Sequence, residues 1–527
     1  MSTAKRSLGG MITGAGSVVL RTGLNLLLIP VLISHLGVSG LGLYLLLVSL
    51  LELAGMVDLG LSVALVTILG SEAVDHPDRH AHLAAGNLLF SLLGILFLIV
   101  GIWLTPFFDS IFHIQGSNHD MARLSFLLMV PEAAFMIYTC YGRSVLLAHN
   151  EHQWTNIADT ASSIISSVGG FLTLIYGYDL TGVMAARLLA AAVRLLIITI
   201  NLAYIEKSSL TAGFTSLNTL KELFSGGVVK QLFRVGGHAM MLNVSIILAH
   251  KIDDVVIARF LPLSAIGIFE IVFRLLGIVI QVGMKLSEGS YPLFTRMSHD
   301  RVAQMDNARL LFIRLSSFLN MVTMMVFLTI LSHYDVILHF MSHSSITPAE
   351  TLPVLLTAVP CLLSGVLQMP ANSLLFTWGY HRFLTTTSVI AAVSNLVLSI
   401  ILVQKIGLVG VAIGTLLPQV IQHQFGLIRK VCQELNISAW SYIKQVHGAI
   451  LIPLLVSYLW IQLFSGWIQE VRLTHQFPWI PLTIACSGAL IIGPLLWFAL
   501  SASKIEREMF QKMVWVPLSK KLSFIKL

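Results

Sequence analysis

The feature that most constrains this sequence is a succession of long apolar runs joined by short polar segments. About fourteen runs of roughly 20 residues follow one another, which is the length that an α-helix needs to cross a bilayer. Charged residues make up only 11% of the chain, whereas soluble domains contain about 25%. The runs do not alternate with polar residues, so a transmembrane β-barrel is excluded. The sequence therefore predicts an all-α polytopic membrane protein with about 14 transmembrane helices.

Lys and Arg residues are distributed unevenly over the segments that join these runs. We place the runs at residues 10–34, 40–69, 83–105, 122–147, 155–176, 180–204, 234–259, 263–287, 311–332, 351–378, 384–404, 407–428, 447–466 and 479–501. If the N-terminus is cytoplasmic, the inner segments hold 23 of the 32 Lys and Arg residues and the outer segments hold four. Cytoplasmic segments of membrane proteins are enriched in these residues. Both termini are therefore predicted to be cytoplasmic, and the net charge of +7 indicates orientation, not a nucleic-acid partner.

Three short segments occur twice, at nearly the same distance along the chain. LGVSGLGLY (36–44) matches LPLSAIGIF (261–269), SVLLAHNEHQW (144–154) matches SLLFTWGYHRF (373–383), and LTGVMAARLL (180–189) matches LVGVAIGTLL (408–417). The matches keep their order, at offsets of 225, 229 and 228 residues, which predicts two copies of a six-helix unit. Because six is even, both copies enter the membrane in the same direction, which predicts a pseudo-twofold axis along the membrane normal.

The duplication divides the chain into five predicted parts. They are an N-terminal six-helix lobe (1–204), a cytoplasmic linker with an interfacial helix (205–233), a C-terminal six-helix lobe (234–430), two C-terminal helices (431–502) and a basic cytoplasmic tail (503–527). Two lobes joined by a tether can rock against each other about a central cleft.

Charged side chains inside the predicted spans point to that cleft. We place eleven there: Arg21, Glu52, Asp58, Glu132, Arg187, Arg194, Lys251, Asp253, Asp254, Glu270 and Arg274. Each costs about 2.5–3.5 kcal/mol at the middle of a membrane helix, so these residues must face one another or water. The last six predicted spans hold none of the eleven. The sequence therefore predicts a hydrated cavity lined chiefly by the first lobe and by the helix pair that opens the second.

Five cations in these spans are candidates for binding an anionic ligand. Arg187 and Arg194 are seven residues apart and project the same way from their helix, and Arg21 has no local acidic partner. Together with Lys251 and Arg274, they are the predicted substrate-binding residues. A diphosphate is the favoured ligand, because its oxygens match the two-pronged geometry of a guanidinium group.

Ion pairing is the alternative role for these cations. Arg21, Arg187 and Arg194 could pair with Glu52, Asp58 and Glu132 and only hold helices together, Glu270 lies four residues before Arg274, and Asp254 lies three residues after Lys251. Glu52, Asp58 and Glu132 are equally candidates for protonation or cation sites that couple transport to an ion gradient.

Neither a metal site nor a cofactor is predicted. His76, His80 and His82 lie close together in an inner loop, where solvated side chains are expected more often than a metal site. The sequence contains no Walker, zincin or nucleophile-elbow pattern. We therefore expect no ATP hydrolysis and no catalytic residues, that is, a protein that is not an enzyme.

The opening of the chain resembles a known family. It has an Arg in the first helix, LG…G…LY at the first outer turn, and DLGLS at 58–62 near the end of the second helix. This pattern resembles the Wzx-type polysaccharide flippases of the multidrug/oligosaccharidyl-lipid/polysaccharide exporter (MOP) superfamily. It does not resemble the opening helix pair of the lipid II flippase.

The resemblance implies a function and a set of contacts. The family translocates an undecaprenyl-diphosphate-linked oligosaccharide across the bacterial inner membrane by alternating access, for O-antigen or exopolysaccharide biosynthesis. By position, Arg21 and Arg274 would contact the diphosphate, and the last two helices would form a groove for the lipid tail. The implied partners are the lipid-linked oligosaccharide and membrane lipid, with polysaccharide polymerase and chain-length machinery as further candidates. The protein is expected to be a monomer.

Two other functions fit parts of the sequence. A drug/cation antiporter of the same superfamily would use the buried acids, but it is expected to have twelve core spans without the extra pair. A membrane polysaccharide polymerase or ligase would need catalytic groups on a sizeable outer loop. The longest predicted outer loops, at about 106–121 and 333–350, are short and poor in arginine, which weighs against that class.

Overall fold

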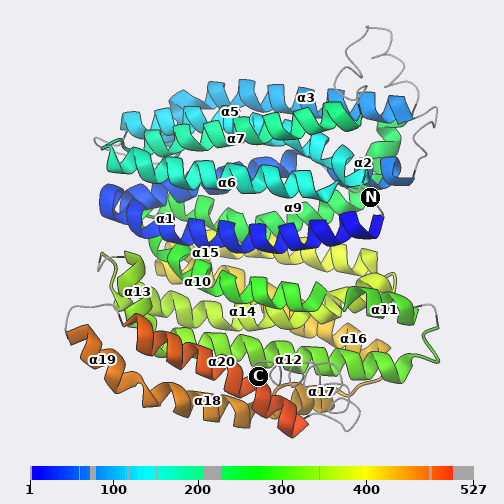
Figure 1. The fold of residues 1–527 in the computed structure, drawn as a ribbon, viewed down its shortest axis with the longest axis vertical. Coiled ribbons are helices and arrows are strands. Elements are labelled where there is room, and N and C mark those ends of the chain that lie inside the picture. Colours follow the sequence, from blue (N-terminus) through cyan, green and yellow to red (C-terminus); the bar gives the residue numbers. More distant parts are fainter. Residues whose placement is uncertain are drawn as a thin grey trace, which may run out of the picture. The chain divides into compact units, whose positions relative to one another are not determined.

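The computed structural model describes residues 3–58, 60–71, 79–112, 114, 119–149, 151–206, 227–288, 290–298, 300–342, 345–473 and 478–501 (Figure 1). Every secondary-structure element in these residues is helical. Ten helices of the described chain are long and apolar enough to cross a membrane. The predicted fold class, an all-α polytopic membrane protein, is therefore confirmed.

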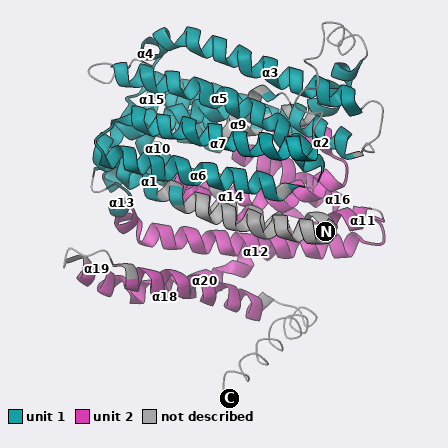
Figure 2. Cartoon of the chain, turned by 45° about the horizontal axis from the view of Figure 1, so that its top comes forward, with its two compact units in different colours: residues 1–272, 338–358, 385–418 teal, residues 273–337, 359–384, 419–527 magenta. Residues whose placement is uncertain are grey.

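The contacts divide the chain into two compact units, coloured separately in Figure 2. Unit 1 comprises residues 1–272, 338–358 and 385–418, and unit 2 comprises residues 273–337, 359–384 and 419–527. Each unit draws on both of the lobes predicted from the repeat, so the lobe boundaries stay a prediction. The predicted linker lies mostly in residues 207–226, and the predicted tail lies in 503–527; both are outside the described residues.

Unit 1 is built mainly from the first half of the chain. Its helices are α1 (Thr3–Ala54), η1 (Gly55–Asp58), α2 (Leu61–Ser71), α3 (Arg79–Leu104), η2 (Thr105–Phe107), α4 (Phe108–Ile111), α5 (His119–Ala148), α6 (His152–Ile175), α7 (Leu180–Ile205) and α9 (Val228–Phe260). Helices α5, α7 and α6 lie side by side (Figure 1), and α1 packs on α6 and α9. The core of the unit includes Leu65, Phe90, Tyr141 and Leu232, all almost completely buried.

Unit 2 contains the last helices. It holds α11 (Tyr291–Ser298), α12 (Met305–Ser332), the π-helix η4 (Ile421–Ile428), α16 (Arg429–Glu434), α17 (Ala439–Val446), η5 (Gly448–Ile450), α18 (Leu451–Leu463), α19 (Ser465–Leu473) and α20 (Trp479–Ser501). Four helices contribute to both units: α10 (Leu263–Glu288), α13 (Tyr334–Ser342), α14 (Pro348–Thr377) and α15 (His381–Val420). In unit 2, α18 packs on α20 and α12 packs on α17, α18 and α20.

The predicted spans fall on these helices. Helices α1 and α15 each contain parts of two predicted spans. In each of them the chain bends at a glycine, Gly37 in α1 and Gly407 in α15, and the helix continues directly after the bend. The spans predicted at 234–259 and 263–287 lie on α9 and α10. Glycine suits both bends because their backbone φ angles are positive, at 69° and 62°.

The first repeated segment forms a turn in both copies, within unit 1. In the first copy, α1 bends at Gly37. In the second copy, α9 ends at Phe260 and α10 begins at Leu263, with Pro262 between them. Gly37 and Pro262 occupy the same place in the repeat. The two copies therefore turn at one equivalent residue, but through different backbone chemistry.

The two copies of this turn also pack against each other through equivalent residues. A Cβ atom on Gly42 would lie 1.8 Å from the carbonyl oxygen of Leu263, and a Cβ atom on Gly267 would lie 3.2 Å from the carbonyl oxygen of Val38. Gly42 corresponds to Gly267 in the repeat, and Val38 corresponds to Leu263. A reciprocal contact of this kind is what a twofold relation produces, so it supports the predicted duplication.

The second repeated segment has the same local structure in its two copies. The first copy is the junction between α5 and α6, and the second copy is the junction between α14 and α15. Both helix ends of the second junction lie 229 residues after those of the first. In the first copy the N–H group of Glu151 donates to the carbonyl of Leu146 at 2.9 Å, and in the second the N–H group of Tyr380 donates to Leu375 at 2.9 Å. Bonds that span five residues satisfy orphan carbonyls at the C-terminus of a helix. The duplication therefore extends to the hydrogen bonds of the turn.

Candidate functional site

A chain of charged side chains crosses unit 1 from α5 to α7. On α7, Arg187 binds Glu132 of α5 through two parallel hydrogen bonds, from Nη2 to Oε1 at 2.7 Å and from Nε to Oε2 at 3.3 Å. Its third contact, from Nη1, is to the hydroxyl of Tyr44 on α1, at 3.3 Å. A bidentate pair is the strongest form of this interaction, and it fixes three helices at one buried point.

The same chain continues two helical turns along α7. The Nη1 atom of Arg194 lies 4.0 Å from Oδ1 of Asp159 on α6, and Nη1 of Arg143 on α5 lies 3.3 Å from the other carboxylate oxygen. Two guanidinium groups therefore share one carboxylate. The Nε–H group of Arg194 is buried and has no hydrogen-bond partner among the residues that the structure describes. A buried donor without a partner is costly. Within this group of side chains, this N–H group is therefore the one that could donate a hydrogen bond to a bound ligand.

The charge of this group of side chains favours the binding of an anion. Glu132 also acts electrostatically on Arg194, which joins the two pairs into one network. Among the described residues, the network holds three guanidinium groups and two carboxylates: Arg143, Arg187, Arg194, Glu132 and Asp159. Within this set the guanidinium groups outnumber the carboxylates by one, and the side chain of Arg143 is 38% exposed. We call these five residues the arginine network.

A second cluster in unit 1 is rich in carboxyl groups. On α9, the Nζ atom of Lys251 lies 3.3 Å from Oε2 of Glu52 on α1 and 3.7 Å from Oε1 of Glu270 on α10. Asp254, one turn along α9, accepts a hydrogen bond from the hydroxyl of Ser49 and lies beside both Lys251 and Glu270. Three carboxyl groups therefore surround this lysine, which suits the exchange of a proton better than the binding of an anion.

Next to this carboxyl group cluster lies a set of oxygen atoms around Asp253, which is 2% exposed. Its carboxylate accepts hydrogen bonds from Thr415 at 2.5 Å and Ser399 at 3.4 Å, both on α15. The side-chain oxygen of Asn395 accepts from the same two hydroxyls, at 3.3 and 2.8 Å. Carboxylate, amide and hydroxyl oxygens are ligands that a hard cation prefers. Among the described residues, no group of three or more His, Cys, Asp or Glu side chains could hold a metal ion.

Comparison with known proteins identifies the family and the fold. A model of the family described as polysaccharide biosynthesis protein matches residues 8–298, which is more than half of the chain. The chain belongs to this family. No curated protein sequence matches it.

Solved structures show that the fold of this polysaccharide biosynthesis protein is that of MOP-superfamily transporters. Lipid II flippase MurJ in an inward closed conformation matches with a TM-score of 0.67 and 15% identity, over 95% of this chain and 100% of that one. An inward-facing MATE-family multidrug transporter of the MOP superfamily matches with a TM-score of 0.61 and 17% identity, over 79% and 95%. A point mutant of the Vibrio cholerae MATE transporter VcmN matches with a TM-score of 0.54 and 14% identity, over 82% and 98%.

These results confirm the resemblance noted in the sequence. They also bear on the contrast drawn there with the lipid II flippase: the chain shares that protein's fold, and at 15% identity the likeness extends to the fold alone. The family match and the ten apolar helices make the chain a multi-pass membrane protein of polysaccharide biosynthesis.

The structure places the predicted binding residues of this polysaccharide biosynthesis protein in different surroundings. Arg187 and Arg194 lie in the arginine network, whereas Lys251 lies among carboxyl groups. Arg274 lies on α10 in unit 2 and has interactions of its own. Arg21 lies on α1, and its side chain is outside the described part of the structure. Of the predicted binding residues whose side chains are described in unit 1, the two α7 arginines share one network and Lys251 lies apart from it.

The three predicted ion-coupling acids also have different partners. Glu132 is bound to Arg187, which is the pairing that the sequence left open as an alternative. Glu52 binds Lys251, and its side chain is 47% exposed. Asp58 accepts a hydrogen bond from the N–H group of Gly60 at 2.6 Å and so holds the turn between η1 and α2.

Several residues of these clusters were not singled out by the sequence reasoning. Asp159 lies inside the predicted span 155–176 but was not counted among the buried charges. Asn395, Ser399 and Thr415 are neutral, so a search for charges passes over them. The repeat carried a usable signal, because Thr415 occupies the position of Arg187 in the second copy.

One local expectation was wrong. His82 was expected to be a solvated loop residue, but it lies on α3, 2% exposed. Its Nε2 atom lies 3.4 Å from the side-chain oxygen of Gln231 on α9. The helix begins at Arg79, four residues before the predicted span, and this extension buries the histidine. His76 lies outside the described residues.

Proposed function

We propose that this protein is a flippase that carries an undecaprenyl-diphosphate-linked oligosaccharide from the inner to the outer leaflet of a bacterial inner membrane. Both termini would lie in the cytoplasm, as the distribution of Lys and Arg indicates. The polyprenyl tail can stay in lipid during transfer, whereas the diphosphate and the sugars need a polar route through the helices.

The observation that carries the proposal is the buried Nε–H group of Arg194, in a network where guanidinium groups outnumber carboxylates. Arg143 and Arg194 share Asp159, and within the described part of the chain the Nε–H group of Arg194 has no hydrogen-bond partner. A diphosphate oxygen at this point would accept a hydrogen bond from that N–H group, and its negative charge would offset the additional guanidinium group. Arg187 is held by Glu132 in the structure, so it would reach the ligand only by exchanging the carboxylate for a phosphate oxygen. Arg21, Lys251 and Arg274 stay candidates on their position alone.

Coupling to an ion gradient is the second part of the proposal. We assign it to the oxygen set around Asp253 and to the carboxyl groups around Lys251, because both could exchange a proton or a cation. The two clusters meet on α9, where Asp253 and Asp254 are neighbours. Binding of an ion at either cluster would therefore change the contacts of α9 with α15 and with α1.

The experiment uses the full-length protein in proteoliposomes with a fluorescent undecaprenyl-diphosphate oligosaccharide. Transfer to the opposite leaflet is measured by a membrane-impermeant reagent that modifies only exposed sugar. We expect Arg194→Gln to reduce the transfer rate by tenfold or more, because it removes the donor at the proposed diphosphate contact. The matched control is Arg123→Gln, which removes an arginine paired with Asp109 at 3.1 Å on a helix end. It should transfer at nearly the wild-type rate.

Other outcomes would reject parts of the proposal. If Arg194→Gln transfers as fast as wild type while both variants insert equally, the arginine network is not the diphosphate site. In cells that lack the protein, single lipid-linked repeat units should accumulate on the inner face. Their accumulation on the outer face would instead indicate a polymerase or ligase.

A drug/cation antiporter is the second candidate function. The carboxyl-rich surroundings of Lys251 favour it, since two acids form ion pairs with this lysine and Asp254 lies nearby, and a buried cationic drug needs acidic partners of this kind. Gradient-driven extrusion of a cationic dye by the purified protein, with no transfer of the lipid-linked sugar, would establish this function and refute the flippase.

A further inference from the structure

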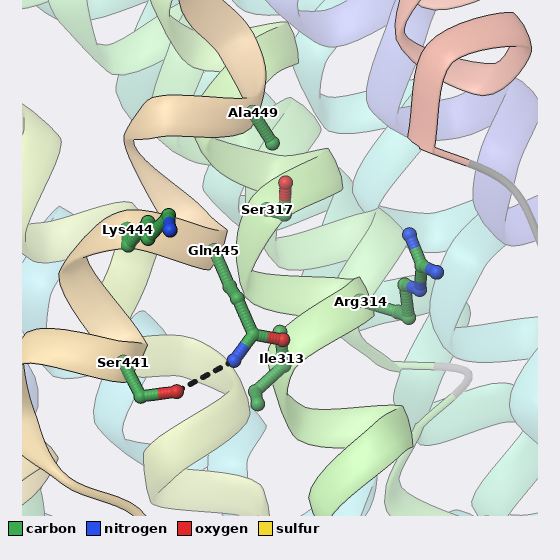
Figure 3. A pocket seen from close by; sticks show the side chains of 7 residues that line it. All are labelled: Ile313, Arg314, Ser317, Ser441, Lys444, Gln445 and Ala449. Carbon is green, nitrogen blue, oxygen red and sulfur yellow. Dashed lines mark hydrogen bonds between the residues drawn. The ribbon is translucent and has the colours of Figure 1, made fainter.

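A cavity of about 480 Å³ lies in unit 2, whereas the arginine network and the carboxyl clusters belong to unit 1. Figure 3 shows its lining, which comes from α12, α17 and η5: Ile313, Arg314, Ser317, Ser441, Lys444, Gln445 and Ala449. The two cations of the lining lie on different helices, Arg314 on α12 and Lys444 on α17, with Gln445 between them in the view (Figure 3). Nothing in the transport proposal uses this cavity.

The lining of the cavity is suited to an anion. It contains a guanidinium, an ammonium, two hydroxyls and an amide, and no carboxylate is among these seven described residues. The amide nitrogen of Gln445 donates to the hydroxyl of Ser441 at 2.7 Å, which orders the polar groups on α17. Phosphate esters bind to such combinations of Arg, Lys and hydroxyl donors.

The position of α17 places the cavity at a membrane surface. This short helix buries Tyr442 and Val446 against the core of unit 2, while Trp440 is 73% exposed and Ile443 is 45% exposed. It opens the apolar stretch Ala439–Val471, which is long enough to cross a membrane, and an exposed tryptophan at the start of a span is typical of the lipid interface. The amide of Asn320 on α12 donates to the carbonyl of Val446 at 3.0 Å and holds the helix there.

We propose that this cavity binds the phosphate of an anionic phospholipid head group of the inner leaflet. The inner leaflet follows from the distribution of Lys and Arg, which places Arg314 and Lys444 on the cytoplasmic side. Basic pockets between helices on that side are suited to anionic head groups. The proposal is independent of the substrate that the protein carries.

The bound head group would act on the last two helices. Ser317 lines the cavity and accepts a hydrogen bond from the indole N–H group of Trp497 on α20, at 2.9 Å. Helix α18 begins directly after η5, which contributes Ala449. A phosphate in the cavity therefore contacts the segments that hold both α18 and α20, and we expect it to stabilise their packing on α12.

The experiment measures lipid retained by the purified full-length protein, by native mass spectrometry after transfer from vesicles of phosphatidylglycerol and phosphatidylcholine. Wild type should retain phosphatidylglycerol preferentially. Each charge removed should weaken binding about fivefold, the equivalent of about 1 kcal/mol per cation near a lipid surface. We therefore expect Lys444→Gln to weaken it about fivefold and the double variant Arg314→Gln/Lys444→Gln about 25-fold. The control Lys430→Gln, which removes an inner-side cation paired with Glu434 at 2.7 Å, should retain the lipid.

Three results would overturn the proposal. One is equal retention of phosphatidylglycerol and phosphatidylcholine by wild type. Another is wild-type retention by Lys444→Gln, which changes an exposed side chain and leaves the fold intact. The third is displacement of phosphatidylglycerol by an equimolar amount of undecaprenyl diphosphate, which would assign the cavity to the carrier lipid and not to bulk phospholipid. Inorganic phosphate alone should not displace the lipid, since it lacks the membrane anchor.

Discussion

The close approach of α1 and α10 at Gly42 leads to a graded prediction about stability. An alanine Cβ atom at position 42 would lie 1.8 Å from the carbonyl oxygen of Leu263, whereas contacts under 3.0 Å are essentially not seen. The two helices would have to move apart by at least about 1.2 Å. Both sides of the contact are backbone, so no side-chain rotation can relieve it. Overpacking in a dense interior costs about 1–3 kcal/mol, and we place Gly42→Ala at the upper end.

Two further glycines on α10 complete the series. At Gly267, a Cβ atom would meet Val38 at 3.1 and 3.2 Å, which needs a shift of only a few tenths of an ångström. That cost is offset by the gain of about 0.5–1 kcal/mol from removing a glycine inside a helix. At Gly277 a Cβ atom would meet no atom of the described residues within 4 Å, so Gly277→Ala should stabilise the protein by about 0.4–1 kcal/mol.

Thermal unfolding of the purified variants in one detergent measures this order. We expect the Tm to fall clearly for Gly42→Ala, to change little for Gly267→Ala and to rise slightly for Gly277→Ala. Size-exclusion profiles check that each variant is monodisperse before heating. If Gly42→Ala unfolds at or above the temperature of Gly277→Ala, the two backbones are not in contact and the reciprocal packing of the two turns is refuted.

Three other substitutions test single interactions. Glu132→Gln should destabilise the protein by about 3–5 kcal/mol because it leaves the buried Arg187 without its counter-charge, and the double variant Glu132→Gln/Arg187→Gln should unfold at a higher temperature than Glu132→Gln alone. Asp179→Ala should cost about 1 kcal/mol, because its side chain caps the N-terminus of α7. Trp497→Phe should cost about 1 kcal/mol by removing the hydrogen bond to Ser317.

Each of these has a result that would contradict it. A double variant no more stable than Glu132→Gln would mean that Arg187 has another counter-charge. Asp179→Asn is the control for the cap, since asparagine caps equally well, and the idea fails if it is as destabilising as alanine. The indole bond is absent if Trp497→Phe unfolds at the same temperature as wild type.

The sequence was sufficient to predict the helices and the repeat, because both depend on local patterns. A run of 20 apolar residues can satisfy its backbone in lipid only as a helix, and equivalent turns such as those at Glu151 and Tyr380 keep the same hydrogen bond. Burial of charge was also predictable in part, since Arg187, Glu132 and Asp253 lie in apolar runs.

The partners of these charges could not be predicted, because they come from distant helices. The spacing allowed Lys251 to pair with Asp254, three residues away, but it gave no indication of the ion pairs with Glu52 and Glu270 on two other helices. Arg187 finds Glu132 at a separation of 55 residues. Spacing along one helix determines which side chains share a face, but it says nothing about the helix that packs opposite.

The difference between Gly37 and Pro262 gives the two turns unequal stiffness. A glycine rotates about both backbone angles at little cost, whereas a proline has a fixed φ angle. The backbone of the first turn is thus more flexible than that of the second turn, although both turns lie at the same place in the repeat. If the helices that these turns connect tilt, we expect the backbone angles to change mainly at the first turn. The helices joined by the second turn are expected to move together.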